Sequence, residues 1–235
     1  HNTNIKKING RFRGQDILSL DQFTSADIQK VLRTAKKLKT LRVNSKPSTL
    51  LSGSIITLLF YEPSTRTCSS FSSAAQQLGA GVIAIQDAKA VSSVAKGETL
   101  TDTINTLESY SDLIVIRHPQ AGSAMEAATA ASVPIINAGD GTNEHPTQTL
   151  LDLYTIYENK GKLNGLTGLL AGDMLHGRTV KSLIRGLSLF KGNKLYLLSP
   201  EKLKLTSEEF RNFSSKGIKL IEITKEKDIP KNAGF

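Results

Sequence analysis

The sequence predicts an α/β protein with two parallel sheets, and three observations support this prediction. Short apolar segments alternate with longer segments of helical periodicity through most of the 235 residues. Strands that alternate with helices in this way form parallel sheets with crossover helices. A long helical segment that begins at Pro146 separates the series into two parts. We therefore expect one domain over residues 1–145 and a second over residues 146–235, which begins with the linking helix.

The first part opens with an amphipathic helix. Thr24 can cap this helix, Asp27 lies at its third position, and apolar residues from Ile28 to Leu38 form one stripe. Helices are then expected at about residues 65–78, 98–109 and 123–131. The apolar runs between them predict strands at residues 54–60, 82–85, 113–116 and 135–137.

The second part begins with a helix from Pro146 to about Asn159, because a proline in the first turn leaves no hydrogen bond unmade. Gly161 is a plausible stop for this helix. Thr206 and Glu209 match a capping box at the start of a later helix. The remaining elements are expected as strands at residues 166–171, 194–198 and 218–223, and helices at residues 180–190 and 207–216.

Composition excludes several classes of protein. No apolar run approaches the roughly 20 residues that span a bilayer, so we expect a soluble protein. The first residues lack the apolar stretch of a secretory signal. The single cysteine, Cys68, excludes an intramolecular disulfide and suits a reducing compartment. Together these features predict a cytoplasmic location.

The net charge of +9 is concentrated near the start of the chain. Residues 1–46 carry 11 Lys and Arg against 3 Asp and Glu, and the remaining 189 residues carry 19 against 18. No aromatic residues interleave with the later part of this basic segment, although a surface that stacks nucleic-acid bases needs them. A solvated helix face therefore accounts for the charge better than nucleic-acid binding does.

The strongest local motif is Ser64-Thr65-Arg66-Thr67, directly after a predicted strand. Ser64 can cap the helix that follows while the next N–H groups stay free. Those donors, the helix dipole, the hydroxyl groups and the guanidinium of Arg66 would suit a phosphate dianion. The alternative is an ordinary serine cap beside a solvent-facing arginine, and this motif alone does not separate the two.

Two further arginines follow strands in the same way. Between Pro47 and Ile184 the only arginines are Arg66, Arg117 and Arg178, and each lies in a loop or at a helix start after a predicted strand. Ligands of open α/β sheets bind at this end of the strands. We expect the three guanidinium groups to converge on a polyanionic substrate or transition state.

A glycine-rich loop precedes His145, which lies just before the predicted helix at Pro146. The positive end of a helix favours the neutral form of an imidazole, so we expect His145 to donate a hydrogen bond rather than a proton. A lone histidine is more often structural, but the position in this loop favours a role in a site. No Asp, Glu, His or Cys cluster has metal-ligand spacing, and neither a dinucleotide-binding nor a Walker sequence is present. We expect neither a metal nor a cofactor.

The sequence resembles the aspartate and ornithine carbamoyltransferase family. The resemblance rests on Ser64–Thr67, on Arg117-His118-Pro119-Gln120 and on the long run from Asn137 to Leu153, and it extends over about residues 18–200. The segment from Ser92 to Leu100 and the segment Gly177-Arg178-Thr179-Val180 are similar to the aspartate branch of that family.

The resemblance implies two α/β domains, the second of them incomplete here, and a homotrimer that shares its active sites between subunits. It implies that carbamoyl phosphate is bound by Ser64, Thr65, Arg66, Thr67, Arg117, His145, Gln148, Ser92 and Lys96. It implies that L-aspartate is bound by Arg178, Thr179 and Lys96. The residues implied to be catalytic are Arg66, Thr67, Arg117, His145 and Lys96, with Ser92 and Lys96 lent by the neighbouring subunit. Glu62 is expected to pair with Arg178 when the substrates are bound.

The chain departs from the family pattern in two places. Ala95 precedes Lys96, where the family often carries a second lysine. The family's later Arg-x-Gln and His-Pro-Leu-Pro motifs are absent, so we expect the native chain to continue beyond Phe235. Two alternatives to the aspartate branch of the family stay open on the sequence. One is an ornithine carbamoyltransferase, and the other is an inactive subunit that serves as a scaffold.

Overall fold

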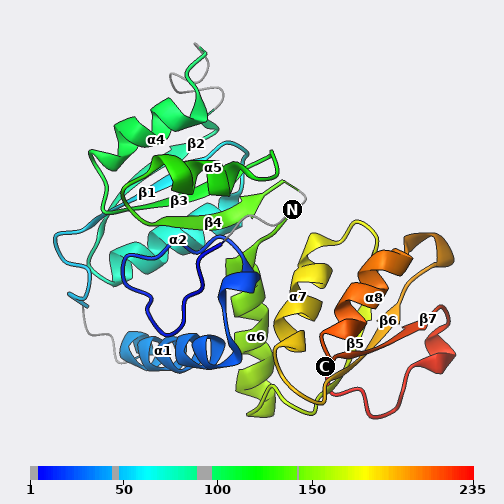
Figure 1. The fold of residues 1–235 in the computed structure, drawn as a ribbon. Helices are drawn as coiled ribbons and strands as arrows, with labels where there is room; N and C mark the ends of the chain where they lie inside the picture. The colour runs from blue at the N-terminus through cyan, green and yellow to red at the C-terminus, as the bar shows by residue number, and fades with distance from the viewer. Residues whose placement is uncertain (1–4, 44–47, 89–96, 142) are drawn as a thin grey trace. The chain divides into compact units, whose positions relative to one another are not determined.

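The structure, a computed structural model, describes residues 5–43, 48–88, 97–141 and 143–235 (Figure 1). The chain forms two compact units, one made of His1–Phe23 and Arg33–Pro146, the other of Thr24–Leu32 and Thr147–Phe235. Each unit contains a parallel sheet. The predicted fold class, α/β with two parallel sheets, is therefore confirmed.

The sheet of the first unit has the strand order β2-β1-β3-β4. Its strands are β1 (Ile55–Phe60), β2 (Gly81–Gln86), β3 (Leu113–His118) and β4 (Ile135–Asp140). Its helices are α2 (Thr65–Gln77), α4 (Leu100–Glu108) and α5 (Ser123–Ala130), and a short 3-10 helix, η1, covers Leu20–Gln22. Helix α1 (Ser25–Val43) has residues in both units. Thr24 and Asp27 cap it as predicted, because the Thr24 amide donates to Asp27 and the Asp27 amide donates to the Thr24 hydroxyl.

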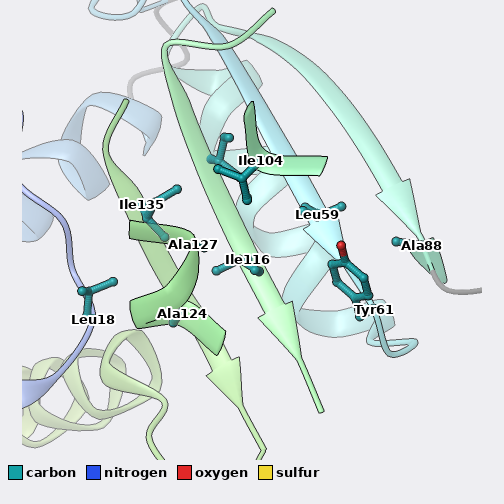
Figure 2. Packing of buried hydrophobic residues seen from close by; sticks show 10 residues of the cluster. Leu18, Leu59, Tyr61, Ala88, Ile104, Ile116, Ala124, Ala127 and Ile135 are labelled. Atoms are coloured by element: carbon teal, nitrogen blue, oxygen red, sulfur yellow. The ribbon is translucent and has the colours of Figure 1, made fainter. Parts of the chain in front are cut away.

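The central strand β1 buries both of its faces, as its continuous apolar sequence predicted. Leu58 and Phe60 point to one side and pack with Cys68 of α2. Leu59 points to the other side, where it packs with residues of α4 and α5 such as Ile104 and Ala127 (Figure 2). Burial of one such large apolar side chain is worth about 1.5–3 kcal/mol. This packing fixes the carboxyl ends of β1, β3 and β4, from which the candidate site is built.

The second unit has the parallel strand order β5-β6-β7. Its strands are β5 (Thr167–Ala171), β6 (Lys194–Leu198) and β7 (Lys219–Ile223), and its helices are α6 (Pro146–Lys160), α7 (Arg178–Ser188) and α8 (Ser207–Ser215). Two 3-10 helices cover Glu201–Leu203 and Glu226–Asp228. Helix α7 approaches α6 closely at Gly186, where a Cβ atom would lie 2.9 Å from the Thr149 methyl group. Thr206 and Glu209 form the predicted capping box of α8.

Several elements begin or end elsewhere than predicted. Strands β3 and β4 continue to His118 and Asp140, because their backbones still pair at these residues. Helix α4 begins at Leu100 rather than residue 98, since Thr99 caps it by accepting from the Asp102 amide. Helix α7 begins two residues earlier than predicted, at Arg178. In the part of the chain that the structure describes, no helix is both long and apolar enough to cross a membrane.

Candidate functional site

The start of α2 presents the first predicted motif. Ser64 occupies the N-cap position, but its side chain makes no capping hydrogen bond, unlike the cap that the sequence suggested. Thr65 and Arg66 are exposed in the first turn, and Thr67 is partly buried. The side chain of Ser64 therefore leaves the first-turn N–H groups uncapped. A helix start of this kind, with hydroxyl groups and a guanidinium around it, suits an anion.

Arg117 is held in place at the end of β3. Its side chain is 13% exposed, and its Nη2 atom lies 2.6 Å from a carboxylate oxygen of Glu62, on the loop after β1. Its Nη1 atom donates to the backbone carbonyl of Ala138 at 3.2 Å. The buried Nε atom has no hydrogen-bond partner in the described structure. The guanidinium is thus oriented by two neighbouring segments before any substrate binds.

The pairing of β3 and β4 contains an irregularity beside Arg117. Ile116 pairs with Asn137, and the next pair joins His118 to Asp140, so β4 carries one extra residue between them. This β-bulge contains Gly139, whose φ of 119° favours glycine. Bulges of this kind often turn side chains toward a site at the end of a sheet.

The bulge makes room for two predicted site residues. A Cβ atom on Gly139 would lie 3.2 Å from Nη1 of Arg117 and 3.5 Å from Cδ2 of His145. The guanidinium and the imidazole therefore border the same glycine. His145 is 7% exposed and directly precedes α6. The imidazole of His145, a hydrogen-bonding group, therefore lies close to the fixed positive charge of Arg117. Two such groups together can polarise an oxygen atom.

Three polar residues in the segment from β4 to His145 were not singled out from the sequence. Asn137, Asp140 and Glu144 are 1%, 2% and 5% exposed. Glu144 accepts from the Ser19 hydroxyl and the Leu20 amide, both at 2.9 Å, and so ties the loop to η1. A signal was present, since Asn137 and Asp140 lie on either side of Ala138-Gly139 at the end of an apolar run and Glu144 comes just before the helix start. Their partners lie up to 125 residues away in the chain, so the sequence alone did not show what they hold.

The predicted residues of the second unit lie at the starts of α6 and α7. Gln148 donates to Asp152 at 2.9 Å, and burial raises the pKa of Asp152, which this hydrogen bond partly offsets. Arg178 is the first residue of α7, and Thr179 follows it on the surface. The convergence of Arg178 with Arg66 and Arg117 stays a prediction, because these residues belong to different units.

Two other predicted features fall outside what the structure tests. Ser92 and Lys96 lie outside the described residues. Glu62 was expected to pair with Arg178 in the presence of substrates, and here its carboxylate contacts Arg117 instead. The pair with Arg178 concerns the bound state and remains a prediction.

A cavity of about 490 Å³ lies at the same end of the sheet as Arg117. The described residues that line it are Tyr61, Glu98, Leu100, His118, Pro119, Gln120 and Glu126, none of them a predicted site residue. Burial lowers the pKa of His118 and raises that of Tyr61, and the two rings lie 4.5 Å apart. Among the described residues, no group of three or more His, Cys, Asp or Glu is arranged to hold a metal ion.

Comparison with known proteins adds independent findings. The model of the aspartate/ornithine carbamoyltransferase, carbamoyl-P binding domain, matches residues 15–158. The aspartate carbamoyltransferase catalytic subunit of Thermococcus kodakarensis is 49% identical over 214 residues, which cover 91% of this chain and 68% of that protein. Aspartate carbamoyltransferase 2, chloroplastic, of Pisum sativum is 44% identical and is matched over 93% of this chain and 58% of its own length.

Solved structures of aspartate transcarbamoylases also match this chain. The catalytic subunit of M. jannaschii aspartate transcarbamoylase superposes with a TM-score of 0.89 at 43% identity, over 93% of this chain and 71% of that one. The Trypanosoma cruzi aspartate transcarbamoylase in complex with carbamoyl phosphate and aspartate gives a TM-score of 0.83 at 39% identity, over 89% of this chain and 67% of that one.

Proposed function

This chain belongs to the aspartate/ornithine carbamoyltransferase family, and we propose that it transfers the carbamoyl group of carbamoyl phosphate to L-aspartate. The products are N-carbamoyl-L-aspartate and phosphate, in de novo pyrimidine biosynthesis. The observation that carries this proposal is the placement of Arg117 and His145 around Gly139. They lie at the carboxyl end of the sheet, where α2 also begins after β1. Relatives named for the aspartate reaction support aspartate over ornithine as the acceptor.

The phosphate group is proposed to bind at the start of α2. Ser64, Thr65 and Thr67 supply hydroxyl groups there, Arg66 supplies a positive charge, and the first-turn N–H groups point toward the anion. As the bond between the carbamoyl carbon and the bridging oxygen breaks, negative charge grows on the departing phosphate. Donors that are already in place stabilise this charge without reorganising.

The carbonyl oxygen is proposed to lie toward Arg117 and His145, with Thr67 beside it. When the neutral amine of aspartate attacks the carbamoyl carbon, this oxygen becomes negatively charged, and the proton that the nitrogen then gives up can pass to the departing phosphate. A fixed guanidinium and an imidazole N–H stabilise an oxyanion, as in other acyl transfers. The reaction needs orientation and electrostatic stabilisation, and it proceeds without a covalent intermediate on the protein.

Residues 1–145 are proposed as the domain that binds carbamoyl phosphate, and residues 146–235 as the linking helix and part of the domain that binds aspartate. Arg178 and Thr179 would hold the carboxylates of aspartate, and Gln148 would contact carbamoyl phosphate. Ser92 and Lys96 would come from the neighbouring subunit of a cytoplasmic homotrimer. The Trypanosoma cruzi structures in complex with carbamoyl phosphate, aspartate or carbamoyl aspartate support this choice of substrates.

The test is product analysis. The protein is incubated with carbamoyl phosphate and either L-aspartate or L-ornithine, and the products are separated by chromatography. We expect N-carbamoyl-L-aspartate with the first amine and no citrulline with the second. Citrulline as the main product would assign the chain to the ornithine reaction, and release of phosphate without either product would refute carbamoyl transfer.

A further inference from the structure

Asp140 occupies the last position of β4, and its carboxylate is fully engaged. Its Oδ2 atom accepts from the Gly122 amide at 3.0 Å and from Nδ2 of Asn143 at 3.1 Å. Its Oδ1 atom accepts from Nδ2 of Asn137 and from the Glu144 amide, both at 3.1 Å. An ionised carboxylate can accept about four hydrogen bonds, so this one is saturated by donors.

The donors come from two segments that carry proposed substrate contacts. Gly122 ends the turn that leads from Arg117 to α5, and Glu144 directly precedes His145. A second contact joins the same segments, since the Gly141 amide donates to the His118 carbonyl at 2.8 Å. A Cβ atom on Gly141 would lie 2.6 Å from the Pro119 carbonyl, so the segments approach too closely for a side chain there.

We infer that Asp140 is a positioning residue that keeps Arg117 and His145 at a fixed separation, so that both meet the carbonyl oxygen of carbamoyl phosphate. This inference rests on the proposed function. Asp140 itself does not contact Arg117 or His145 through any of the four hydrogen bonds, and it acts through the backbone on either side of them. A displacement of such groups by about 1 Å can cost about 100-fold in rate.

The role requires a carboxylate rather than an amide. Each oxygen of Asp140 receives two N–H donors, so an asparagine in either orientation would place its –NH2 group against two of them. The resulting loss of hydrogen bonds and the new contact between donors would push the two segments apart. The start of α2 lies after a different strand, β1, and takes no part in these hydrogen bonds.

Because the start of α2 is independent of Asp140, equilibrium binding of two ligands can test the inference. Dissociation constants for carbamoyl phosphate and for inorganic phosphate are measured by calorimetry on the native protein, on Asp140→Asn and on Asp27→Asn. Asp27 is a matched control, because it is also 2% exposed and its carboxylate also accepts a backbone amide, at the cap of α1. Thermal unfolding of each variant is followed in parallel.

We expect the native protein to bind carbamoyl phosphate more tightly than phosphate, since Arg117 and His145 add contacts to the carbonyl oxygen. In Asp140→Asn this preference should fall by about tenfold or more, while phosphate affinity should change by less than about threefold. Asp27→Asn should lower the unfolding temperature and leave the preference intact. A general loss of stability would instead weaken the binding of both ligands alike.

A second variant keeps the test valid if Asp140→Asn fails to fold. Asn143 is exposed, so Asn143→Asp should fold while placing a second carboxylate beside Asp140. We expect its preference for carbamoyl phosphate over phosphate to fall by about threefold or more. If folded variants keep the native preference, the positioning role of Asp140 is overturned although the proposed function stands. If the native protein itself shows no preference for carbamoyl phosphate, the proposed function fails and this inference fails with it.

Discussion

Arg66 and Arg117 carry the same charge in different surroundings. Arg66 is exposed in the first turn of α2, whereas Arg117 is bound to Glu62 and to the Ala138 carbonyl. An exposed guanidinium at a helix start can contact a phosphate group that binds there. A guanidinium held from two sides is suited to an oxygen whose position is fixed. The two residues therefore lead to different predictions.

Substitution of Arg66 should remove stabilisation of the departing phosphate. Arg66→Ala is expected to reduce kcat/KM by roughly 100- to 1000-fold, as for other charge-assisted donors in a transition state. Steady-state kinetics with carbamoyl phosphate and aspartate measure the effect. Arg211→Ala, an exposed arginine of α8, is the control and should change kcat/KM little. Turnover of Arg66→Ala near the native rate would remove Arg66 from the site.

Glu62 is expected to exchange partners when the substrates bind. In this structure it pairs with Arg117, and the bound state is predicted to bring it to Arg178. Glu62→Gln should therefore raise the KM for aspartate and lower turnover, because a neutral amide holds neither arginine as strongly. Unchanged kinetics for aspartate would eliminate the pair with Arg178.

At the scale of single elements, the sequence predicted the order and type of the main helices and strands. Buried parallel strands are continuous apolar runs, and such runs stand out in a chain with few other apolar stretches. The ends of elements were less accurate, because they depend on neighbours: β3 continues past residue 116 since Phe60 of β1 pairs with Arg117. The hydrogen bond from the Gly122 amide to Asp140 was unpredictable for the same reason, as it joins the end of β4 to a turn 18 residues earlier.

The cap of α8 allows a prediction about stability and pH. Glu209 is partly buried, which raises its pKa, but hydrogen bonds from Lys181 and Thr206 prevail and lower the pKa from the ordinary value of 4.5. A lowered pKa in the folded state means that the contribution to stability is present at neutral pH. It is lost as the pH falls below 4.5 and through the folded-state pKa.

Glu209→Gln should therefore lower the free energy of unfolding by about 1 kcal/mol at pH 7 and by much less at about pH 3. Thermal or urea unfolding at the two pH values measures the difference. Glu208→Gln is the control, since Glu208 lies in the same turn but outside the capping box. An equal effect of Glu209→Gln at both pH values would contradict this account.

At the scale of the whole molecule, we propose that the active site is shared between subunits. Lys96 and Ser92 would enter the neighbour's site, where a lysine offsets the negative charge of two anionic substrates. An isolated subunit would then be inactive. No part in this site is assigned to the basic N-terminal segment, residues 1–46.

Complementation between inactive variants tests the sharing. Lys96→Ala and Arg66→Ala subunits, each nearly inactive alone, are mixed under conditions that allow exchange. Some sites in mixed trimers would then combine an intact Arg66 with an intact Lys96, and part of the activity should return. Mixed trimers that form, as shown by native mass spectrometry, and stay inactive would rule out the shared site.

The most direct test of the central claim is a competition between the two acceptor amines in one reaction. The native protein receives carbamoyl phosphate labelled with ¹³C in the carbamoyl group, together with equal concentrations of L-aspartate and L-ornithine. The proposed function predicts that the label appears in N-carbamoyl-L-aspartate and that His145→Ala slows its appearance. Label that accumulates in citrulline, or that reaches neither amine while phosphate is released, would contradict it.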